Sequence, residues 1–312
     1  MKKSLIIVLL LMVGNVFGQS SDDFDITQNA QGGITITGYR GTIRDVVIPE
    51  AIEGIKVMEI NGGVFSNRGL TSVVIPNSII SIGGGNPFFG GNGAFQGNQL
   101  TSLIIPDSVT TIQSMAFQDN QLVNVTIGNG VTAIGSQAFG NNPLMSITIG
   151  ANVELYTTNN IMGQPSFGNL GFETNYNNGG RQAGTYIRID TGSRRWGRQF
   201  DNFLVIGTRA ITIVDYTGVG GDLTIPSTIE NIPVTTIGAE AFLRIQITSI
   251  IIPESVTNIG NNAFPTNNLT SITIPANVNY ANLFPHNFNA FYQSQDRRAG
   301  TYTWSGRVWS VR

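Results

Sequence analysis

The apolar residues of this chain recur in a seven-residue pattern whose first, fourth and sixth positions are Leu, Ile or Val. The pattern reads Leu70-Thr-Ser-Val-Val-Ile-Pro76, and it returns at 100–106, 122–128, 144–150, 247–253 and 269–275. The steps from 100 to 122 to 144, and from 247 to 269, are 22 residues each. A fixed period of this length is typical of a solenoid, in which stacked units bury a shared core. The longer first step carries a predicted loop insertion in the glycine-rich stretch 83–93.

Each unit is predicted to contain a strand, a corner, a short second apolar run and a buried Phe. Successive side chains of a strand point to opposite faces, so the fourth and sixth positions of the pattern should point inward together. A Pro at the seventh position ends the strand because it has no N–H to donate. The second run and the recurring aromatic residue are Ile82, Ile112, Ile134 and Ile259, and Phe95, Phe117, Phe139 and Phe264. Unrelated strands of a β-sandwich would not repeat the same residue types at this period, so we reject that alternative.

The units close on Asn-rich turns such as Asn120-Gln121 and Asn141-Asn142-Pro143. Asn tolerates the left-handed backbone conformation and bonds to its own backbone, which suits a sharp corner. We therefore interpret these asparagines as corner residues.

A larger repeat divides the chain. An offset of 177 residues carries Ile34-Thr-Ile36 onto Ile211-Thr-Ile213, and Ala183-Gly-Thr-Tyr186 recurs as Ala299-Gly-Thr-Tyr302. We interpret the chain as a tandem duplication of a capped array, each copy ending in a β-hairpin-like cap. The expected segments are a leader at 1–18, a flexible start at 19–23, a first copy at 24–199 and a shorter second copy at 200–312.

The first eighteen residues have the features of a secretory signal peptide. Lys2 and Lys3 precede an apolar run from Leu5 to Val13, and small residues follow up to Gly18. Nine apolar residues are too few to cross about 30 Å of hydrocarbon, so the segment is not predicted to span a membrane. A buried N-terminal strand is the alternative reading. We expect an exported protein without a membrane span in its mature chain, at the cell surface or secreted, with the periplasm left open.

Composition excludes several classes of protein and site. Only 12% of the residues are charged, against roughly 25% in an average globular protein, which argues against a coiled coil. The net charge of −2 argues against a nucleic-acid partner. The chain has no Cys and one His, so disulfides, thiolate chemistry and multi-histidine metal sites are excluded, and we expect no cofactor.

The repeat resembles a known family. Leu-x-x-Ile-x-Ile-x-x-Asn, at 144–152 and 269–277, is similar to the leucine-rich repeat core, and the continuation at 252–264, Ile-Pro-x-x-Val-Thr-x-Ile-Gly-x-x-Ala-Phe, resembles the BspA-like subclass of bacterial surface proteins. The resemblance implies an exported cell-surface protein that binds host or bacterial proteins. At the ninth position of the core most units have another residue, so an unbroken asparagine ladder is not expected there, although Ser could make similar turn bonds. These residues are Ser78, Ser108, Gly130 and Ser255.

Enzymatic signatures are weak. His286 has no nucleophile elbow to accompany it, Gly83-Gly84-Gly85 is followed by no Gly-Lys-Ser/Thr, and Asp22-Asp23-Phe24-Asp25 lacks the spacing of a calcium loop. We therefore expect a non-enzymatic protein.

Two surfaces are candidates for binding. The first is the outward face of the strands, at the third and fifth positions of the pattern, which is an uncharged strip of small side chains; a featureless scaffold face is its alternative. These residues are Ser72, Val74, Ser102, Ile104, Asn124, Thr126, Ser146, Thr148, Ser249, Ile251, Ser271 and Thr273.

The second candidate is the pair of Arg- and Trp-rich segments at 181–198 and 297–312, which contain all three tryptophans of the chain. Arg beside Trp suits anionic glycans or partner hot spots, but the same residues also suit a solenoid cap, and we favour the cap. In the second segment, the alternation around Ser305-Gly306 predicts a hairpin. Its binding candidates are Arg297, Arg298, Trp304, Arg307 and Trp309.

Two functions follow from these observations. The first is an exported, non-enzymatic leucine-rich repeat protein that binds a protein ligand and mediates adhesion at the cell surface. The alternative is a structural envelope component whose Arg/Trp hairpins attach it to glycan or to copies of itself.

The leader generates the first testable prediction. We expect export to remove residues 1–18 and to leave Gln19 at the N-terminus, because the small residues before Gly18 suit signal peptidase. Intact-mass measurement of the exported protein checks this, and a retained Met1 would contradict it.

Overall fold

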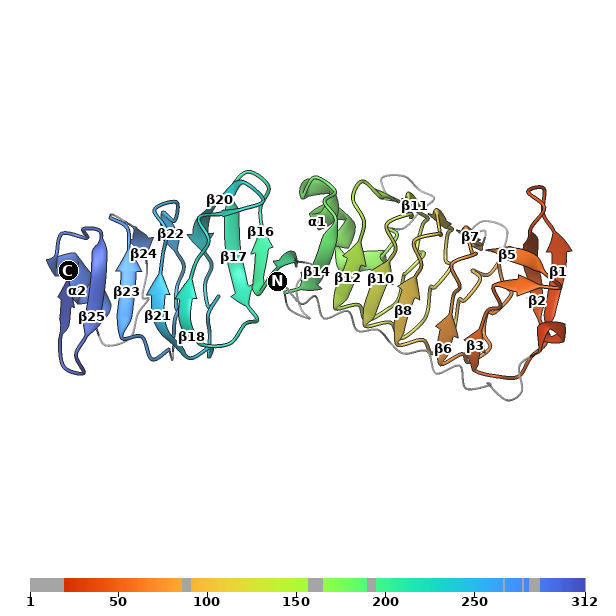
Figure 1. Ribbon diagram of the computed structural model, residues 1–312, viewed down its shortest axis with the longest axis horizontal. Coiled ribbons are helices and arrows are strands. Elements are labelled where there is room, and N and C mark those ends of the chain that lie inside the picture. Colours follow the sequence, from red (N-terminus) through yellow and green to blue (C-terminus); the bar gives the residue numbers. More distant parts are fainter. Residues whose placement is uncertain are drawn as a thin grey trace.

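The computed structural model describes residues 20–85, 91–156, 165–189, 195–265, 267–276, 278–280 and 287–311. The predicted leader lies outside these residues, as do His286 and part of the glycine-rich insertion. The molecule is an elongated stack of coils, with strands β1 (Phe24–Gln28) and β2 (Ile34–Tyr39) at one end and strand β25 (Gly300–Trp304) at the other (Figure 1). The predicted leucine-rich repeat solenoid is confirmed.

The first array has two sets of parallel strands, one for each apolar run of the repeat. The seven-residue pattern forms β3 (Asp45–Val47), β6 (Ser72–Val74), β8 (Ser102–Ile105), β10 (Asn124–Ile127) and β12 (Ser146–Ile149). The second run forms β5 (Ile55–Ile60), β7 (Ser81–Ile82), β9 (Thr111–Ile112), β11 (Ala133–Ile134) and β13 (Glu154–Leu155). Equivalent residues pair in register, as Leu103, Val125 and Ile147 do across β8, β10 and β12. The array opens with the short helix η1 (Ser21–Asp23), β1, β2 and β4 (Ala51–Ile52).

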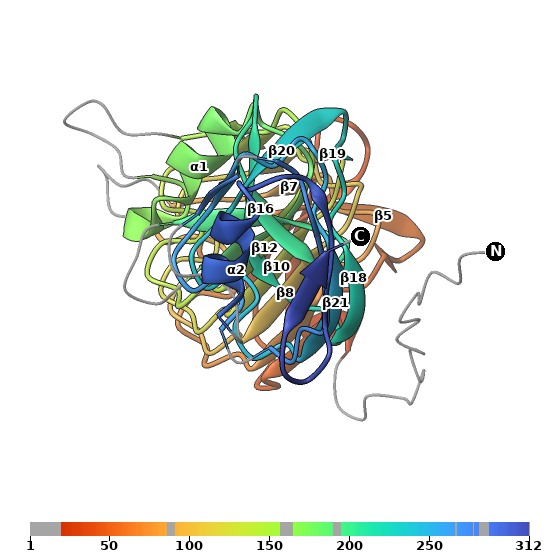
Figure 2. The same ribbon diagram turned by 90° about the vertical axis from the view of Figure 1, so that its left-hand side faces the viewer.

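Each array ends in a cap made of a short helix and an antiparallel hairpin. The first cap contains η2 (Gly168–Leu170), α1 (Phe172–Asn178), β14 (Gly184–Arg188) and β15 (Trp196–Phe200), and the second contains α2 (Phe288–Ser294), β25 and β26 (Trp309–Val311). Strand β14 pairs antiparallel with β12, and β25 does so with β23 (Ser271–Ile274). The predicted hairpins are present, but the sequence analysis did not predict the helices. Seen from the C-terminal end, α2 lies across the end of the stack (Figure 2).

The second array is shorter than the first. A β-hairpin of β16 (Phe203–Ile206) and β17 (Ile211–Tyr216) opens it. Its first-run strands are β18 (Gly221–Thr224), β21 (Ile247–Ile251) and β23, and its second-run strands are β20 (Ile232–Ile237), β22 (Asn258–Ile259) and β24 (Asn279–Tyr280), with β19 (Thr228–Ile229) beside β20.

One sheet joins the two arrays, and it passes from first-run strands of the first array to second-run strands of the second array. Its strand order is β24-β22-β20-β17-β16-β15-β14-β12-β10-β8. The first-run strands β8, β10 and β12 of the first array are therefore continuous, through the two hairpins, with the second-run strands of the second array, whereas β3 and β6 form a separate two-stranded sheet. The first-run strands β18, β21 and β23 of the second array belong to a separate sheet with β25 and β26.

The predicted Phe residues form a buried column. Phe117 is fully buried, and its ring lies parallel to those of Phe95 and Phe139 at centroid distances of 5.1 and 5.5 Å. The column continues from Phe65 to Phe167. Rings offset at these distances are favourable beyond their burial alone. The buried apolar residues form two clusters, one from Phe24 to Trp196 and one from Phe203 to Trp309.

A ladder of buried asparagines runs beside the Phe column, formed by residues that the sequence pattern indicates as corner residues. Asn120 accepts a hydrogen bond from the Leu100 N–H at 3.2 Å and donates to the Phe95 and Phe117 carbonyls at 3.0 and 3.1 Å. The equivalent residues are Asn98, Asn142 and Asn267.

These asparagines stand two residues before the first Leu or Ile of the pattern, not at its ninth position. They are not the corner residues either, because the left-handed backbone lies one residue earlier, at Gly97, Asp119 and Asn141. At the ninth position, the buried Oγ atoms of Ser78 and Ser108 have no hydrogen-bond partner among the described residues, whereas Ser255 donates to the Ser227 carbonyl. The turn bonds suggested for serine are therefore absent in two of these three units.

One buried carboxyl group interrupts the apolar interior of the first cap. Glu173, in the first turn of α1, is 3% exposed and accepts a hydrogen bond from the Phe167 N–H. Burial raises the pKa of Glu173 to about 7, and this hydrogen bond only partly opposes that effect. At the corresponding position of the second cap stands the neutral Asn289.

The Phe column predicts a large effect of truncation. We expect Phe117→Ala to lower the free energy of unfolding of the first array by roughly 3–5 kcal/mol, because it removes a ring packed on both faces. Val123→Ala is the matched control, since Val123 is 38% exposed and should change stability by less than about 1 kcal/mol. Denaturant unfolding measures both. A change under about 0.5 kcal/mol for Phe117→Ala would contradict the packing.

Glu173 predicts a pH dependence of stability. Because its folded pKa lies above its unfolded value, the folded state binds more protons between about pH 4.5 and 7, so stability falls as pH rises through this window. We expect the first array to lose up to about 3 kcal/mol between pH 5 and pH 8 from this group. Glu173→Gln should remove this dependence in unfolding curves measured at both pH values, and an unchanged slope in the variant would contradict the assignment.

Candidate functional site

The outward residues of the first-run strands form flat rows on the surface, as the period-two pattern predicts. Ser102 and Asn124 lie side by side in register, as do Ile104 and Thr126 on the next row, and all four are exposed. Their neighbours at the fourth and sixth positions, such as Leu103 and Ile105, are buried. The outward orientation of these candidate residues is therefore confirmed.

The structure separates the candidate residues into two strips. The first strip is formed by β3, β6, β8, β10 and β12, and the second by β18, β21 and β23. The first contains Asp45, Val47, Ser72, Val74, Ser102, Ile104, Asn124, Thr126, Ser146 and Thr148. The second contains Asp222, Thr224, Ser249, Ile251, Ser271 and Thr273. The prediction of a single strip is wrong, because the sheet that contains β8, β10 and β12 continues into the second-run strands of the second array.

The first strip has an apolar row that the sequence analysis only partly found. Val47, Val74 and Ile104 occupy its fifth-position row and are 41%, 41% and 69% exposed. Val47 belongs to the segment Ile43-Arg-Asp-Val-Val-Ile-Pro49, which matches the seven-residue pattern and could have been included from the sequence. Large exposed apolar patches mark interaction sites on monomeric proteins, which makes this position of the pattern a candidate.

The neighbouring row of the first strip is polar and begins with a carboxylate. The Oδ1 atom of Asp45 accepts hydrogen bonds from the hydroxyls of Thr71 and Ser72 at 2.6 and 2.8 Å, and these bonds lower the pKa of Asp45. Asp222 holds the same position in the second strip and accepts a hydrogen bond from the Thr248 hydroxyl at 3.2 Å. The uncharged strip predicted from the sequence thus has an acidic first position in each array.

The caps cover the last position of each strip. The hydroxyls of Thr148 and Thr185 lie 2.8 Å apart, and those of Thr273 and Thr301 lie 2.9 Å apart. Ser146, Thr148, Ser271 and Thr273 are accordingly half-buried, and Ser249 is half-buried as well. The exposed outward positions of the first strip therefore lie on β3, β6, β8 and β10.

The Arg and Trp candidates divide between the interior and the surface of the caps. Trp309 is buried against Phe288, with ring centroids 4.9 Å apart. Arg297 is half-buried, donates to the Val278 carbonyl and lies 5.8 Å from the centre of the Tyr280 ring. Both residues hold the cap together, in agreement with the cap interpretation. Arg298 and Arg307 are exposed, and Trp304 is half-buried.

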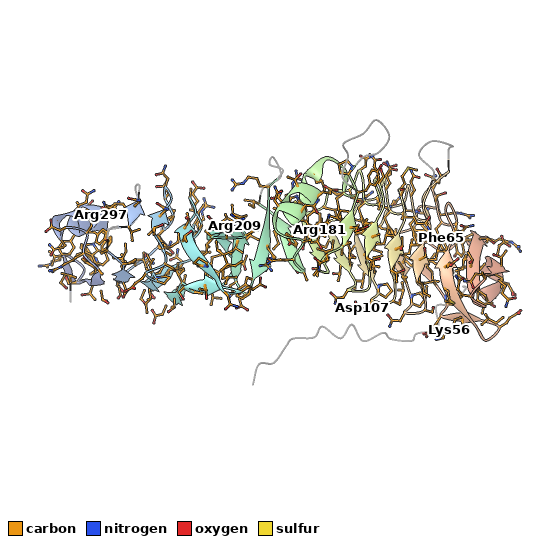
Figure 3. The ribbon with its side chains drawn as sticks, turned by 90° about the horizontal axis from the view of Figure 1, so that it is seen from above. Lys56, Phe65, Asp107, Arg181, Arg209 and Arg297 are labelled. Atoms are coloured by element: carbon orange, nitrogen blue, oxygen red, sulfur yellow. The ribbon has the colours of Figure 1, made fainter. Side chains whose placement is uncertain are left out.

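The first cap is an internal joint. Trp196 is buried and donates through Nε1 to the Leu170 carbonyl at 3.1 Å. Arg198 makes a bidentate ion pair with Glu230 of the second array, at 3.1 and 2.6 Å, which lowers the pKa of Glu230. Arg181 and Arg209 lie near the middle of the rod, whereas Arg297 lies at one end and Lys56 at the other (Figure 3).

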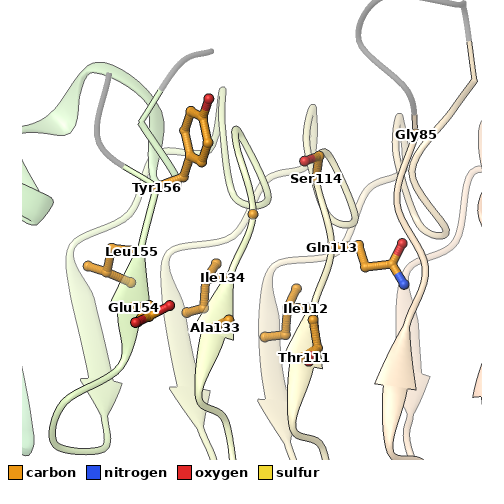
Figure 4. A pocket seen from close by; sticks show the side chains of 11 residues that line it. Gly85, Thr111, Ile112, Gln113, Ser114, Ala133, Ile134, Glu154, Leu155 and Tyr156 are labelled. Carbon is orange, nitrogen blue, oxygen red and sulfur yellow. The ribbon is translucent and has the colours of Figure 1, made fainter. Parts of the chain in front are cut away.

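A shallow trough of about 440 Å³ crosses β9, β11 and β13 on the second-run side of the first array (Figure 4). Thr111, Gln113, Ser114 and Tyr156 give it a polar wall, and Glu154 is the one charged residue among its described lining residues. This lining contains no histidine or lysine that could serve as a general base beside a hydroxyl. Among the described residues, no three acidic or histidine side chains gather as a metal site requires.

Within the described part of the chain, no helix is both long and apolar enough to cross a membrane.

Comparisons with solved structures find leucine-rich repeat proteins. A leucine-rich repeat protein of Treponema pallidum is 18% identical over 84% of this chain and 85% of its own, with a TM-score of 0.32. A leucine-rich cell surface protein of Faecalibacterium prausnitzii is 17% identical over 90% and 97%, with a TM-score of 0.23. A leucine-rich repeat protein from Bacteroides ovatus is 17% identical over 85% and 67%, with a TM-score of 0.29. A comparison with curated protein sequences finds no match.

The family assignment rests on the repeat itself. The model of the BspA type leucine-rich repeat region matches residues 42–92, 58–153, 90–183 and 222–295, which together exceed half of the chain. These matches cover the parallel repeat strands, the Phe column and the asparagine ladder of both arrays, and leave out the opening hairpins and the hairpins of the caps. The chain therefore belongs to the BspA-type leucine-rich repeat family.

Proposed function

We propose that this protein is an exported, cell-surface scaffold that binds a partner protein through the first strip, without catalysis. The observation that carries the proposal is the exposure of Val47 and Val74, which pair across β3 and β6, and of Ile104 at the same pattern position of β8, beside hydroxyl and amide side chains. Family membership supports an interaction role at the surface. Adhesion and export are the parts of the proposal that go beyond that role, and both depend on the predicted leader.

The geometry of the first strip suits an extended segment of a partner protein. Its side chains are short, so an incoming chain can approach the sheet closely and cover the apolar row. The hydroxyls of Ser102 and Thr126 and the amide of Asn124 can donate and accept hydrogen bonds next to that row. The terms that favour binding are therefore apolar burial and neutral hydrogen bonds, which depend little on salt.

An alternative use of the surface is attachment to an anionic glycan through the second cap, which would make the protein a structural envelope component. The exposed guanidinium groups of Arg298 and Arg307 beside the half-buried Trp304 favour this reading. Such a contact would weaken as salt rises, because exposed charges are screened beyond about 8 Å at physiological ionic strength.

Paired variants separate the two functions. Ile104→Glu with Thr126→Glu places charge on the first strip, and Ile251→Glu with Thr273→Glu is the matched change on the second strip. Arg298→Ala with Arg307→Ala removes the exposed cap charges and spares Arg297, which holds the cap. Binding is measured to a panel of purified matrix proteins and to purified cell-wall material, with circular dichroism as the folding control.

We expect only the first-strip variant to lose protein binding, by at least about tenfold, with little response to salt. Loss confined to the arginine variant, with steep salt dependence and cell-wall binding in the parent, would overturn the proposal in favour of the envelope component.

A further inference from the structure

Among the residues that the structure describes, the two ends of the rod are edge strands. Strand β1 ends its sheet, and β26 ends the sheet of the second array at the opposite end of the molecule (Figure 1). An edge strand presents backbone groups that can pair with another chain. Proteins often protect such edges against pairing, so the residues along an edge strand indicate whether another chain can pair with it.

In the middle of the molecule, two equivalent strands pair with each other. Strand β15, the last strand of the first cap, pairs antiparallel with β16, the first strand of the second array. Arg198 lies opposite Val205, and Phe200 lies opposite Phe203. This joint shows how the end of one array meets the beginning of another.

Strand β26 repeats β15. In the first cap Tyr186 pairs with Arg198, and in the second Tyr302 pairs with Val311. The supporting rings repeat as well, since Phe172 meets Tyr186 at 5.4 Å and 87°, and Phe288 meets Tyr302 at 5.2 Å and 88°. The second cap therefore presents the edge that the first cap uses in the joint.

Strand β1 repeats β16. Phe24 pairs with Tyr39 as Phe203 pairs with Tyr216, and in each hairpin the register shifts two residues after the Phe. Ile26 of β1 thus corresponds to Val205 of β16. The beginning of the first array presents the edge that the second array uses in the joint.

Residues at the ends of the rod are more exposed than the corresponding residues at the joint, as expected if no neighbouring strand covers them at the ends. Ile26 is 38% exposed, whereas the corresponding Val205 is 2% exposed. Ile55 is 39% exposed, whereas the corresponding Ile232 is half-buried and packed on the core. At the other end, Val308 is 63% exposed.

In both edge strands, backbone N–H and C=O groups point away from the rest of the sheet, where another strand could pair with them. The Ser305 N–H donates to the Val308 carbonyl, so alternation along the hairpin directs the backbone groups of Val311 away from β25. The Asn29 N–H donates to the Gly33 carbonyl, so the same alternation directs those of Ile26 away from β2.

The charges of the two ends are opposite. Residues 20–60 contain seven acidic and three basic side chains, and residues 287–311 contain three arginines and one aspartate. At the internal joint Arg198 meets Glu230, and the residue that corresponds to Glu230 at the free end is Glu53, with a similar φ of 52°. Attraction between the ends would favour their encounter at low salt.

We propose that this protein associates head to tail, with β26 of one molecule adding antiparallel to β1 of the next and Val311 lying opposite Ile26. The contact joins different surfaces of the two molecules, so it does not close at two copies and builds a linear chain of rods. The first strip stays open along such a chain, and the inference does not depend on which ligand it binds.

The test uses the purified chain that begins at Gln19, studied by sedimentation velocity over a range of concentrations. We expect the average mass to rise beyond that of a dimer as concentration increases, and to fall as salt increases. Ile26→Lys and Val311→Lys should each weaken association at least about tenfold, because each charges one edge. Val219→Lys is the matched control, since Val219 is 88% exposed in the loop between β17 and β18, away from both edge strands, and this variant should associate as the parent does.

A mixture of the Ile26→Lys and Val311→Lys variants separates this arrangement from others. Each variant retains one intact end, so a head-to-tail contact allows the mixture to form dimers and nothing larger. A parent that stays monomeric at the highest concentration reached, or that closes at a dimer, would overturn the proposal. So would a mixture that forms no dimer, provided that circular dichroism shows both variants folded.

Discussion

The stacking of coils depends on a buried asparagine that belongs to two coils at once. The carboxamide of Asn120 bonds the Leu100 N–H and the Phe117 carbonyl of its own coil and the Phe95 carbonyl of the preceding coil. Each bond contributes only about 0.5–1.5 kcal/mol net, but removing the carboxamide would leave buried main-chain groups without partners, at about 1–3 kcal/mol each. The ladder therefore fixes the offset between neighbouring coils. The Phe column then packs at that fixed spacing.

The flat strips follow from this constraint. Because every coil is held at the same offset, equivalent strand residues align in rows, and a side chain's place in the seven-residue pattern decides whether it is buried or displayed. A helical cap ends the aligned rows of each array at the position where no further coil supplies hydrogen-bond and packing partners. The first cap pairs with a new hairpin, and the second leaves its last strand at the end of the rod. The joint and the free ends thus share their strand register and ring packing, although Val311 stands where the joint has Arg198, and this likeness makes the internal joint a template for the proposed association between molecules.

Much of this fold is predictable from periodicity. The strands, the inward Phe117 and the hairpins after residues 183 and 299 follow from residue type and spacing alone. The buried role of Asn120 and Asn142 was missed because Asn is also the usual corner residue, and the neighbouring Asp119 and Asn141 do take the left-handed backbone. The change of face between arrays was not predictable, because it depends on how β14 to β17 pair in space. The same change divides the predicted strip in two. The outward rows were predictable from period two, but the burial of Trp309 and Arg297 depends on α2, which no periodic signal announces.

Native-state hydrogen exchange tests the role of the asparagine ladder most directly. The amides of Leu100 and Leu122, which donate to Asn120 and Asn142, should exchange only through global unfolding of the first array, so their opening free energy should equal its unfolding free energy. If these amides instead exchange through local openings several kcal/mol less costly than global unfolding, the ladder does not hold the coils together and the account is wrong.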